Sequence, residues 1–282
     1  MVTLEQLQAG IVIPVDKPRQ WTSFQAVNKI KAVVRNTYGQ RDTCGAKADP
    51  GVGLKKFKIG HAGTLDPLAT GLLLVCIGKA TKTIPQLQDG DKVYTGTLVL
   101  GASTPCYDLE RPVDHYFPYE HINAELLNET VRQFTGTILQ VPPMFSAVKI
   151  DGQRAYEYAR TDDPSVTIQP KPVNVYSFEI TAFRECSTHN APADPHTASP
   201  QDIPSKNLYQ HPLGEVPAHL PQADFRIHCG KGTYIRSLAR DLGEALGSGA
   251  FLSALRREQV GSYTIADAIQ LDDVASYLHN LA

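Results

Sequence analysis

The sequence predicts a mixed α/β protein, of the α/β or α+β type, with a partly antiparallel sheet. Apolar runs of strand length and segments with a helical period follow one another without a strict βαβ rhythm. The chain has 282 residues and 42% hydrophobic content, which suffices for a sizeable core in one large domain or two small ones. Charged residues make up 20%, and apolar residues recur throughout, so wholesale disorder is excluded.

Strands are predicted where short apolar runs end at turn-forming residues. The first run, Ile11–Val15, ends at Asp16-Lys17-Pro18. A second, Leu72–Ile77, is apolar throughout, which is typical of a strand buried on both faces. The remaining predicted strands are Val93–Leu100, Val173–Ile180 and Phe225–Cys229.

Helices are predicted where apolar residues recur near the helical period. Thr22 or Ser23 can cap the first helix, whose apolar positions are Phe24, Val27, Ile30 and Val34. The other predicted helices are Asn123–Phe134, Ser237–Leu246 and the acidic Asp272–Leu281.

Two segments are predicted as loops. Arg41–Gly53 is rich in glycine and polar residues. Cys186–Gln222 holds seven prolines and four histidines without an apolar period, so we expect a long exposed excursion between two strands. The histidines could suggest a metal site, but their irregular spacing favours an ordinary polar loop.

Charge and cysteine content limit the possible classes of protein. The net charge is −2, yet Lys17–Arg35 carries five Lys/Arg and no acid, and Phe225–Arg240 carries four and none. These stretches could line a phosphate-binding face, although solvated basic faces are common. Five cysteines without C-x-x-C spacing give no support for a zinc ribbon or a disulfide framework. No apolar run is long enough to span a bilayer, and Met1–Gly10 lacks a signal-peptide pattern. We expect a cytoplasmic protein.

The densest chemical signal is Gly60–Gly71, where three glycines, one histidine and one aspartate fall within twelve residues. Glycine permits unusual backbone angles and close approach of another chain segment, and Pro67 biases Asp66 toward an extended conformation. The pattern favours a tight loop that holds a carboxylate in one place. A glycine-rich turn whose aspartate supports its own backbone is the alternative.

A phosphate-binding P-loop is excluded. Gly78-Lys79 resembles the end of such a loop, but Leu73 stands where its first glycine is needed. Ala80 also replaces the Ser or Thr that would bind magnesium.

Gly60–Gly71 resembles the signature motif of the TruB family of tRNA pseudouridine synthases, whose aspartate corresponds to Asp66. Further segments match family motifs in the same order, over residues 11 to about 261. They are Asp16-Lys17-Pro18 with Trp21-Thr22-Ser23, Lys92-Val93-Tyr94 followed by Gly101 and Thr104, Gln140–Lys149 running into Gly152 and Arg154-Ala155-Tyr156, Cys229–Arg236, and Leu255-Arg256-Arg257.

The resemblance implies the pseudouridine-synthase fold, an α+β architecture with a central, largely antiparallel sheet flanked by helices. It implies conversion of uridine 55 in the T-loop of tRNA to pseudouridine, without a cofactor or metal. The implied partner is the T-arm of tRNA, with no obligatory protein partner and a monomeric enzyme. We expect a catalytic domain over 1–262, with an insertion at 186–222. A short helical tail over 263–282 would stand where many bacterial members have a C-terminal RNA-binding module.

The resemblance also assigns site residues. Asp66 is the expected nucleophile, and whether it attacks the ribose or assists departure of the base stays open. A stacked uridine must be flipped out to react, and Tyr94 is expected to stack on the flipped base. Arg236 is expected to pair with Asp66 and keep the Asp66 carboxylate ionised. Substrate contacts are expected from His61, Tyr234 and Leu255. Candidate RNA-backbone contacts, each of which could instead be a solvated surface charge, are Lys17, Lys149, Arg154, Arg256 and Arg257.

Two other functions compete with this one. A relative with the same fold could act on other RNAs or be guided by an RNA partner, and activity on a bare T-arm hairpin would distinguish the two. A non-enzymatic RNA chaperone is the second alternative, but it would need neither Asp66 nor Tyr94 nor Arg236.

Overall fold

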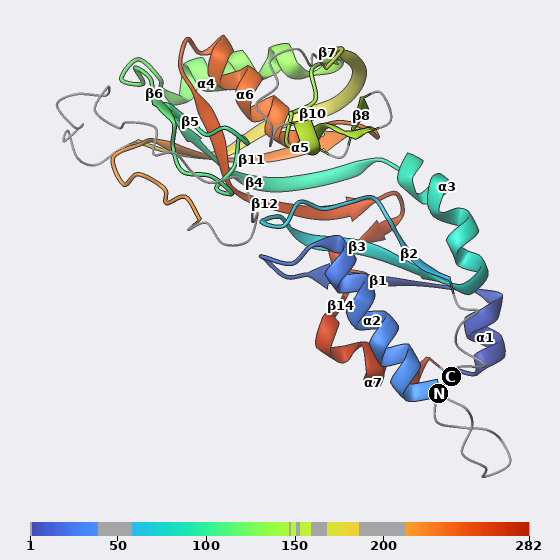
Figure 1. Ribbon diagram of the computed structural model, residues 1–282. Helices are drawn as coiled ribbons and strands as arrows, with labels where there is room; N and C mark the ends of the chain where they lie inside the picture. Colours follow the sequence, from blue (N-terminus) through green and yellow to red (C-terminus); the bar gives the residue numbers. More distant parts are fainter. Residues whose placement is uncertain are drawn as a thin grey trace, which may run out of the picture. The chain divides into compact units, whose positions relative to one another are not determined.

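The computed structural model describes residues 2–38, 58–146, 148–150, 153–158, 168–185 and 213–281 (Figure 1). These residues fall into two units. Unit 1 comprises those of Met1–Val93 and Arg256–Ala282, and unit 2 those of Tyr94–Leu255. Strands β4 (Lys92–Leu100) and β12 (Ala250–Val260) have residues in both units.

Unit 1 is built on strands that surround one buried strand, β3 (Thr70–Ile77). β3 pairs antiparallel with β1 (Ile11–Lys17) and β2 (Ile59–Ala62), and parallel with β12 at Arg256 and Arg257. The short strands β13 (Tyr263–Thr264) and β14 (Ile269–Gln270) pair with β12 and β1. Every β3 residue from Gly71 onward is buried, which confirms the prediction from its unbroken apolar run.

The helices of unit 1 include two that lie side by side, α2 (Ser23–Tyr38) and α7 (Val274–Asn280) (Figure 1). Thr22 caps α2, because its Oγ1 accepts a hydrogen bond from the Gln25 main-chain N–H at 3.0 Å. Further helical segments among the described residues of the unit are α1 (Leu4–Ala9), α3 (Ile84–Asp89) and the 3₁₀ turns at Gly78–Thr83, Ile265–Asp267 and Leu271–Asp273.

The predicted apolar face of α2 is wrong at one position. Val27, Ile30 and Val34 are buried, but the Phe24 side chain is 68% exposed. Ser23 takes the inward position of the first turn instead, where its hydroxyl bonds to the main chain of Leu65. The next residue of a helix points about 100° away from such a position, and this rotation turns Phe24 toward solvent.

Unit 2 is dominated by antiparallel strands. β10 (Lys171–Arg184) pairs antiparallel with both β11 (Gln222–Cys229) and β7 (Gly136–Gln140). In strand order, β11 is followed by β4 and then β12. Two short hairpins stand apart, formed by β5 (Ala102–Ser103) with β6 (His115–Tyr116) and by β8 (Lys149–Ile150) with β9 (Gln153–Arg154).

The helices of unit 2 include α4 (Ala124–Val131) and α6 (Ile235–Ala245), which contact each other, while α4 also contacts β10 (Figure 1). Asn123 caps α4 by accepting from the Leu126 N–H at 2.9 Å. Arg132–Phe134 continues α4 as a 3₁₀ turn, and α5 spans Ala155–Tyr158.

The predicted fold class is confirmed, since the chain is a mixed α/β protein with a large, mostly antiparallel sheet and flanking helices. The predicted loop Arg41–Gly53 lies outside the described residues, as does 186–212. Where the structure describes the chain, it holds no helix that is both long enough and apolar enough to cross a membrane. The predicted division of the chain at residue 262 stays a prediction.

The predicted exposed excursion is wrong at its C-terminal end. Leu220 is 3% exposed, and the Gly214 N–H donates to the Leu109 carbonyl at 2.9 Å. The Pro221 carbonyl in turn accepts from the N–H of Leu100 in β4 at 3.0 Å. This part of the segment is packed onto unit 2.

Candidate active site

Asp66 lies in the short loop that joins β2 to β3 in unit 1. Gly63 and Gly71, at the two ends of this loop, have φ angles of +91° and +99°, which favour glycine over other residues. A Cβ on Gly71 would lie 2.3 Å from the main-chain oxygen of Arg257. The Asp66 carbonyl accepts from the Ala69 N–H at 3.1 Å. The structure therefore agrees with the predicted tight glycine-bounded loop around a carboxylate.

The residues on both sides of Asp66 are held by the segment that leads into α2. The Ser23 hydroxyl accepts from the Leu65 N–H at 2.9 Å and lies 3.2 Å from the Leu65 carbonyl, to which it donates. On the other side, the Pro67 carbonyl accepts from the Gln20 N–H at 2.8 Å and from Lys17 Nζ at 3.2 Å. Asp66 is thus flanked by two anchored residues.

Lys17 is fully buried, although it was predicted to contact RNA phosphates. Its ammonium group donates to the carbonyls of Pro18, Trp21 and Pro67, and its exposed fraction is 0%. Burial lowers its pKa to about 8, and the nearby charge of Asp66 opposes that shift. This position is unsuited to a phosphate contact and suits a role in fixing the loop.

Arg256 and Arg257, two further candidates for phosphate contacts, also have partners within unit 1. Arg256 forms a two-pronged ion pair with Asp16, with N–O distances of 2.8 and 3.1 Å, and its side chain remains 36% exposed. Arg257 is 1% exposed and donates to carbonyls of the Asp66 loop. Burial counts against an RNA contact for Arg257 but not for Arg256. The side chains of Lys149 and Arg154 lie outside the described residues.

His61, the predicted substrate contact, lies in β2 and is half-buried. Burial lowers the pKa of its imidazole, and the charge of Arg257 adds to the shift. Its Nδ1 atom is buried and has no hydrogen-bond partner among the described residues. The lowered pKa favours the neutral imidazole.

Arg236, near the start of α6 in unit 2, is 5% exposed. It donates from Nη1 to the Cys106 carbonyl at 3.0 Å and from Nη2 to the Phe145 carbonyl at 2.8 Å. Its Nε lies 3.7 Å from a carboxylate oxygen of Asp108. Sequence reasoning did not single out Asp108, and the only available signal was an acid shortly after the quoted Gly101 and Thr104. The predicted pairing of Arg236 with Asp66 stays a prediction.

The residues predicted to line the uridine pocket lie in unit 2. Tyr94 is buried, and Tyr234 and Leu255 are half-buried. The Tyr234 main chain is fixed by the Gln140 side chain, which accepts from its N–H at 2.8 Å and donates to its carbonyl at 3.1 Å. Gln140 is 1% exposed, and sequence reasoning did not single out its side chain, although it begins one of the quoted motifs.

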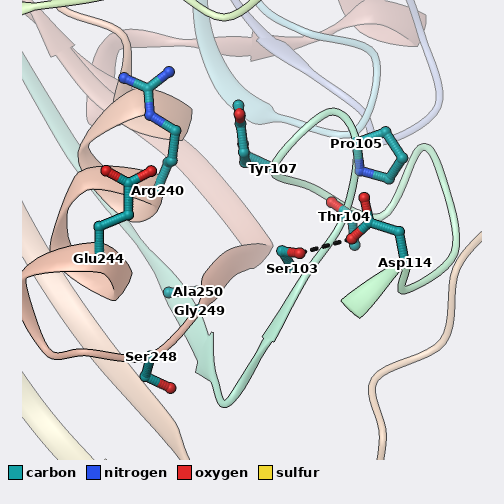
Figure 2. Close-up of a pocket in the computed structure, with 10 residues that line it drawn as sticks. All are labelled: Ser103, Thr104, Pro105, Tyr107, Asp114, Arg240, Glu244, Ser248, Gly249 and Ala250. Atoms are coloured by element: carbon teal, nitrogen blue, oxygen red, sulfur yellow. Dashed lines mark hydrogen bonds between the residues drawn. The ribbon is translucent and has the colours of Figure 1, made fainter. Parts of the chain in front are cut away.

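A separate pocket of about 220 Å³ lies in unit 2 (Figure 2). None of the predicted site residues lines it. Arg240, one turn after Arg236 on α6, lies over the Tyr107 ring with its guanidinium carbon 5.4 Å from the ring centroid. On the other side, Ser103 donates to Asp114 at 2.7 Å (Figure 2).

Within the described part of the chain, no group of three or more His, Cys, Asp or Glu side chains could hold a metal ion. Of the four histidines of the predicted excursion, only His219 belongs to that part.

Comparisons with known proteins decide the family. Residues 52–191 match the model described as TruB family pseudouridylate synthase (N terminal domain). A protein of Flavobacterium johnsoniae named tRNA pseudouridine synthase B is 45% identical over 270 residues, which cover 96% of each chain. The chain belongs to the TruB family of pseudouridylate synthases. Proteins of the same name from Phocaeicola vulgatus and Thermobifida fusca are each 40% identical, covering 95% of this chain and 93% and 74% of theirs.

Membership of the TruB family makes the chain an enzyme, an isomerase that forms pseudouridine. A second model, described as tRNA pseudouridylate synthase B C-terminal domain, matches residues 236–281. That match runs from Arg236, in α6 of unit 2, to Leu281 in the predicted tail.

Among solved structures, one chain of a Cbf5–Nop10–Gar1 complex is similar to this TruB-family chain, with a TM-score of 0.58 and 25% identity. The match covers 97% of this chain and 55% of that one, so this chain spans about half of its length. The likeness supports the fold.

Proposed function

We propose that this member of the TruB family converts uridine 55 in the T-loop of tRNA into pseudouridine, with Asp66 as the nucleophile on a flipped-out uridine. The coarser statement, isomerisation of uridine to pseudouridine in tRNA, follows from its family and from the shared name of its relatives. We infer that the T-arm is the recognised part, and that a monomer acts without an obligatory protein partner.

The observation that carries the proposal is the anchoring of the Asp66 loop. Leu65 and Pro67, the two neighbours of Asp66, are both hydrogen-bonded to the segment 17–23. A carboxylate held in this way loses little conformational freedom when it reaches the reacting atoms, which favours catalysis by positioning. A turn that only supported itself would not need anchors from a distant segment.

The reaction balances with protein side chains alone. The N1–C1′ bond of the uridine breaks and a C5–C1′ bond forms, while C5 loses a proton and N1 gains one. Nothing is oxidised and no water is consumed overall, so we expect no cofactor or metal. A carboxylate can stabilise or attack the electron-poor sugar carbon left by the departing base.

The remaining predicted residues fit this chemistry. We propose that Tyr94 stacks on the flipped base, and that Tyr234 and Leu255 contact it. Burial lowers the pKa of His61, which favours the neutral imidazole, and we propose that it contacts the substrate through hydrogen bonds or stacking. We propose that Arg236 orients the Asp66 carboxylate.

The deciding experiment incubates the protein with unmodified tRNA and maps pseudouridine by position. We expect pseudouridine at position 55, formed also in an isolated T-arm hairpin. Asp66→Asn should reduce product formation below roughly a thousandth of wild type and leave tRNA binding within about threefold, because the amide keeps the shape without the charge. Product at another position would refute the assignment to nucleotide 55, and an active Asp66→Asn enzyme would refute the role of Asp66.

A further inference from the structure

Arg257 joins the two ends of the loop that carries Asp66. Its Nη2 donates to the Gly63 carbonyl at 3.1 Å and its Nη1 to the Thr64 carbonyl at 3.4 Å, both on the β2 side of the loop. Its Nε donates to the Leu72 carbonyl at 2.8 Å, on the β3 side. One planar group therefore fixes the separation between the entry and the exit of the loop.

The main chain of Arg257 contacts the same loop. Gly71 is its partner in the parallel pairing of β3 with β12, and a Cβ at Gly71 would meet the Arg257 oxygen and nitrogen at 2.3 and 2.8 Å. The absence of a side chain at Gly71 brings β12 close enough for the guanidinium to reach across to Gly63 and Thr64.

The environment of Arg257 is unusual for a buried cation. The side chain is 1% exposed, and among the described residues it has three carbonyl partners and forms no ion pair. Burying a charge without a bonded carboxylate is unfavourable. An apolar side chain would fill the same space with a lower free-energy cost, so packing alone does not explain an arginine here. The neighbouring Arg256, in contrast, is partly exposed and paired with Asp16.

We propose that Arg257 is a positioning residue for Asp66, whose guanidinium holds the loop at the geometry that the reaction requires. This inference rests on the proposed role of Asp66 as the nucleophile. Arg257 does not touch the substrate in this proposal, since its side chain is buried beneath the loop.

Arg257→Lys is the sharpest test, because lysine keeps the charge and loses the fork. An ammonium carries all its donors on one nitrogen, so it cannot reproduce the spacing of Nε, Nη1 and Nη2 that spans the two sides of the loop. We expect the single-turnover rate of pseudouridine formation to fall at least about tenfold, since a misplacement of the order of 1 Å can cost more than that. The dissociation constant for tRNA should change less than about threefold, because Arg257 is not on the surface.

A merely structural role is distinguished by a matched control, Leu278→Ala. Leu278 is a fully buried residue of α7 in the same unit, and its truncation lowers stability without touching the loop. At a temperature where both variants are folded by circular dichroism, Leu278→Ala should keep the wild-type rate and Arg257→Lys should not. Equal rates for the two variants would overturn the proposal.

A second variant, Arg257→Gln, removes the charge and retains a donor for one side of the loop, so it decides the question if the lysine variant does not fold. A wild-type rate in either folded variant overturns the proposal, and so does failure of both to fold, which would make Arg257 a folding residue. Asp66→Asn is measured in parallel. If it stays active, or if the wild type forms no pseudouridine, the proposed function has failed rather than the role of Arg257.

Discussion

Replacing Arg236 with lysine separates two roles for this residue. Its guanidinium is 5% exposed and bonds the carbonyls of Cys106 and Phe145, with its Nε 3.7 Å from the Asp108 carboxylate. Lysine keeps the positive charge but cannot reproduce the planar fork. If Arg236 contacts a phosphate, lysine should serve nearly as well. If it orients catalytic groups, lysine should be a poor substitute.

The magnitude follows from the lost bonds. Lysine carries all its donors on one nitrogen, so it cannot reproduce the two separate Nη contacts with Cys106 and Phe145. Each buried carbonyl left without its partner costs about 1–3 kcal/mol. The free energy of unfolding should fall by this amount. The single-turnover rate should fall at least about tenfold, equivalent to about 1.4 kcal/mol of barrier, if the transition state needs the same orientation. Affinity for tRNA should hardly change, because the charge remains.

The assay uses enzyme in excess over tRNA that carries tritium at C5 of uridine. C5 loses its hydrogen when the new C–C bond forms, so tritium release follows the chemical step. The matched control is Arg240→Lys, one turn further along α6. Arg240 bonds Asp241 and the Val141 carbonyl at 2.7 and 3.0 Å, so its replacement should lower stability by a comparable amount and leave the rate unchanged.

Two results would refute this reasoning. A normal single-turnover rate, with at most a small loss of tRNA affinity, would make Arg236 a phosphate contact that lysine can replace. An equal loss of rate in Arg240→Lys would show that the effect comes from general disturbance of α6 and not from the fork of Arg236.

Three further changes test other parts of the molecule. Tyr94→Phe should bind tRNA normally, whereas Tyr94→Ala should lose about 1–3 kcal/mol of base stacking, and full single-turnover activity of the alanine variant would remove Tyr94 from the site. Deleting 186–212 while keeping Leu213–Pro221, which packs on unit 2, should preserve activity, and a folded deletion that fails to bind tRNA in a filter-binding assay would contradict this. Burial lowers the pKa of Lys17 to about 8 from 10.5, so the unfolded chain binds more protons between these values. The contribution of Lys17 to the free energy of unfolding should therefore rise by about 3 kcal/mol from pH 8 to 10.5. If the free energy of unfolding, measured in urea, depends on pH equally in wild type and Lys17→Met, this contribution is absent.

The fold was predictable where a local pattern decided the structure. The apolar run Leu72–Ile77 became a buried strand, and Thr22 and Asn123 cap the helices predicted beside them. β12 was missed because its second half reads Arg256 to Gln259 in polar residues. The polar residues do not predict a buried strand, because the carbonyls that bond the buried Arg257 side chain belong to residues far away in the sequence.

The charge pattern was the least informative part of the sequence. Lysine and arginine are almost never fully buried unless paired, so Lys17 and Arg257 were reasonably predicted as surface contacts with phosphate. Both are buried instead, because each meets several carbonyls at once. The number of carbonyls that a cation meets is set by tertiary structure, and no local count of charges can supply it.

The order of the quoted motifs gains a physical reason in each unit. In unit 1, the segments 16–23, 60–71 and 256–257 lie far apart in sequence, and hydrogen bonds from the first and last hold the middle one, which carries Asp66. In unit 2, Arg236 is bonded to Cys106 and Phe145, so the segment carrying it is held from two others. When the side chains of one motif bond the main chain of another, the donors and acceptors of both motifs must be present together. A resemblance over all of them at once is therefore more specific than any single residue type.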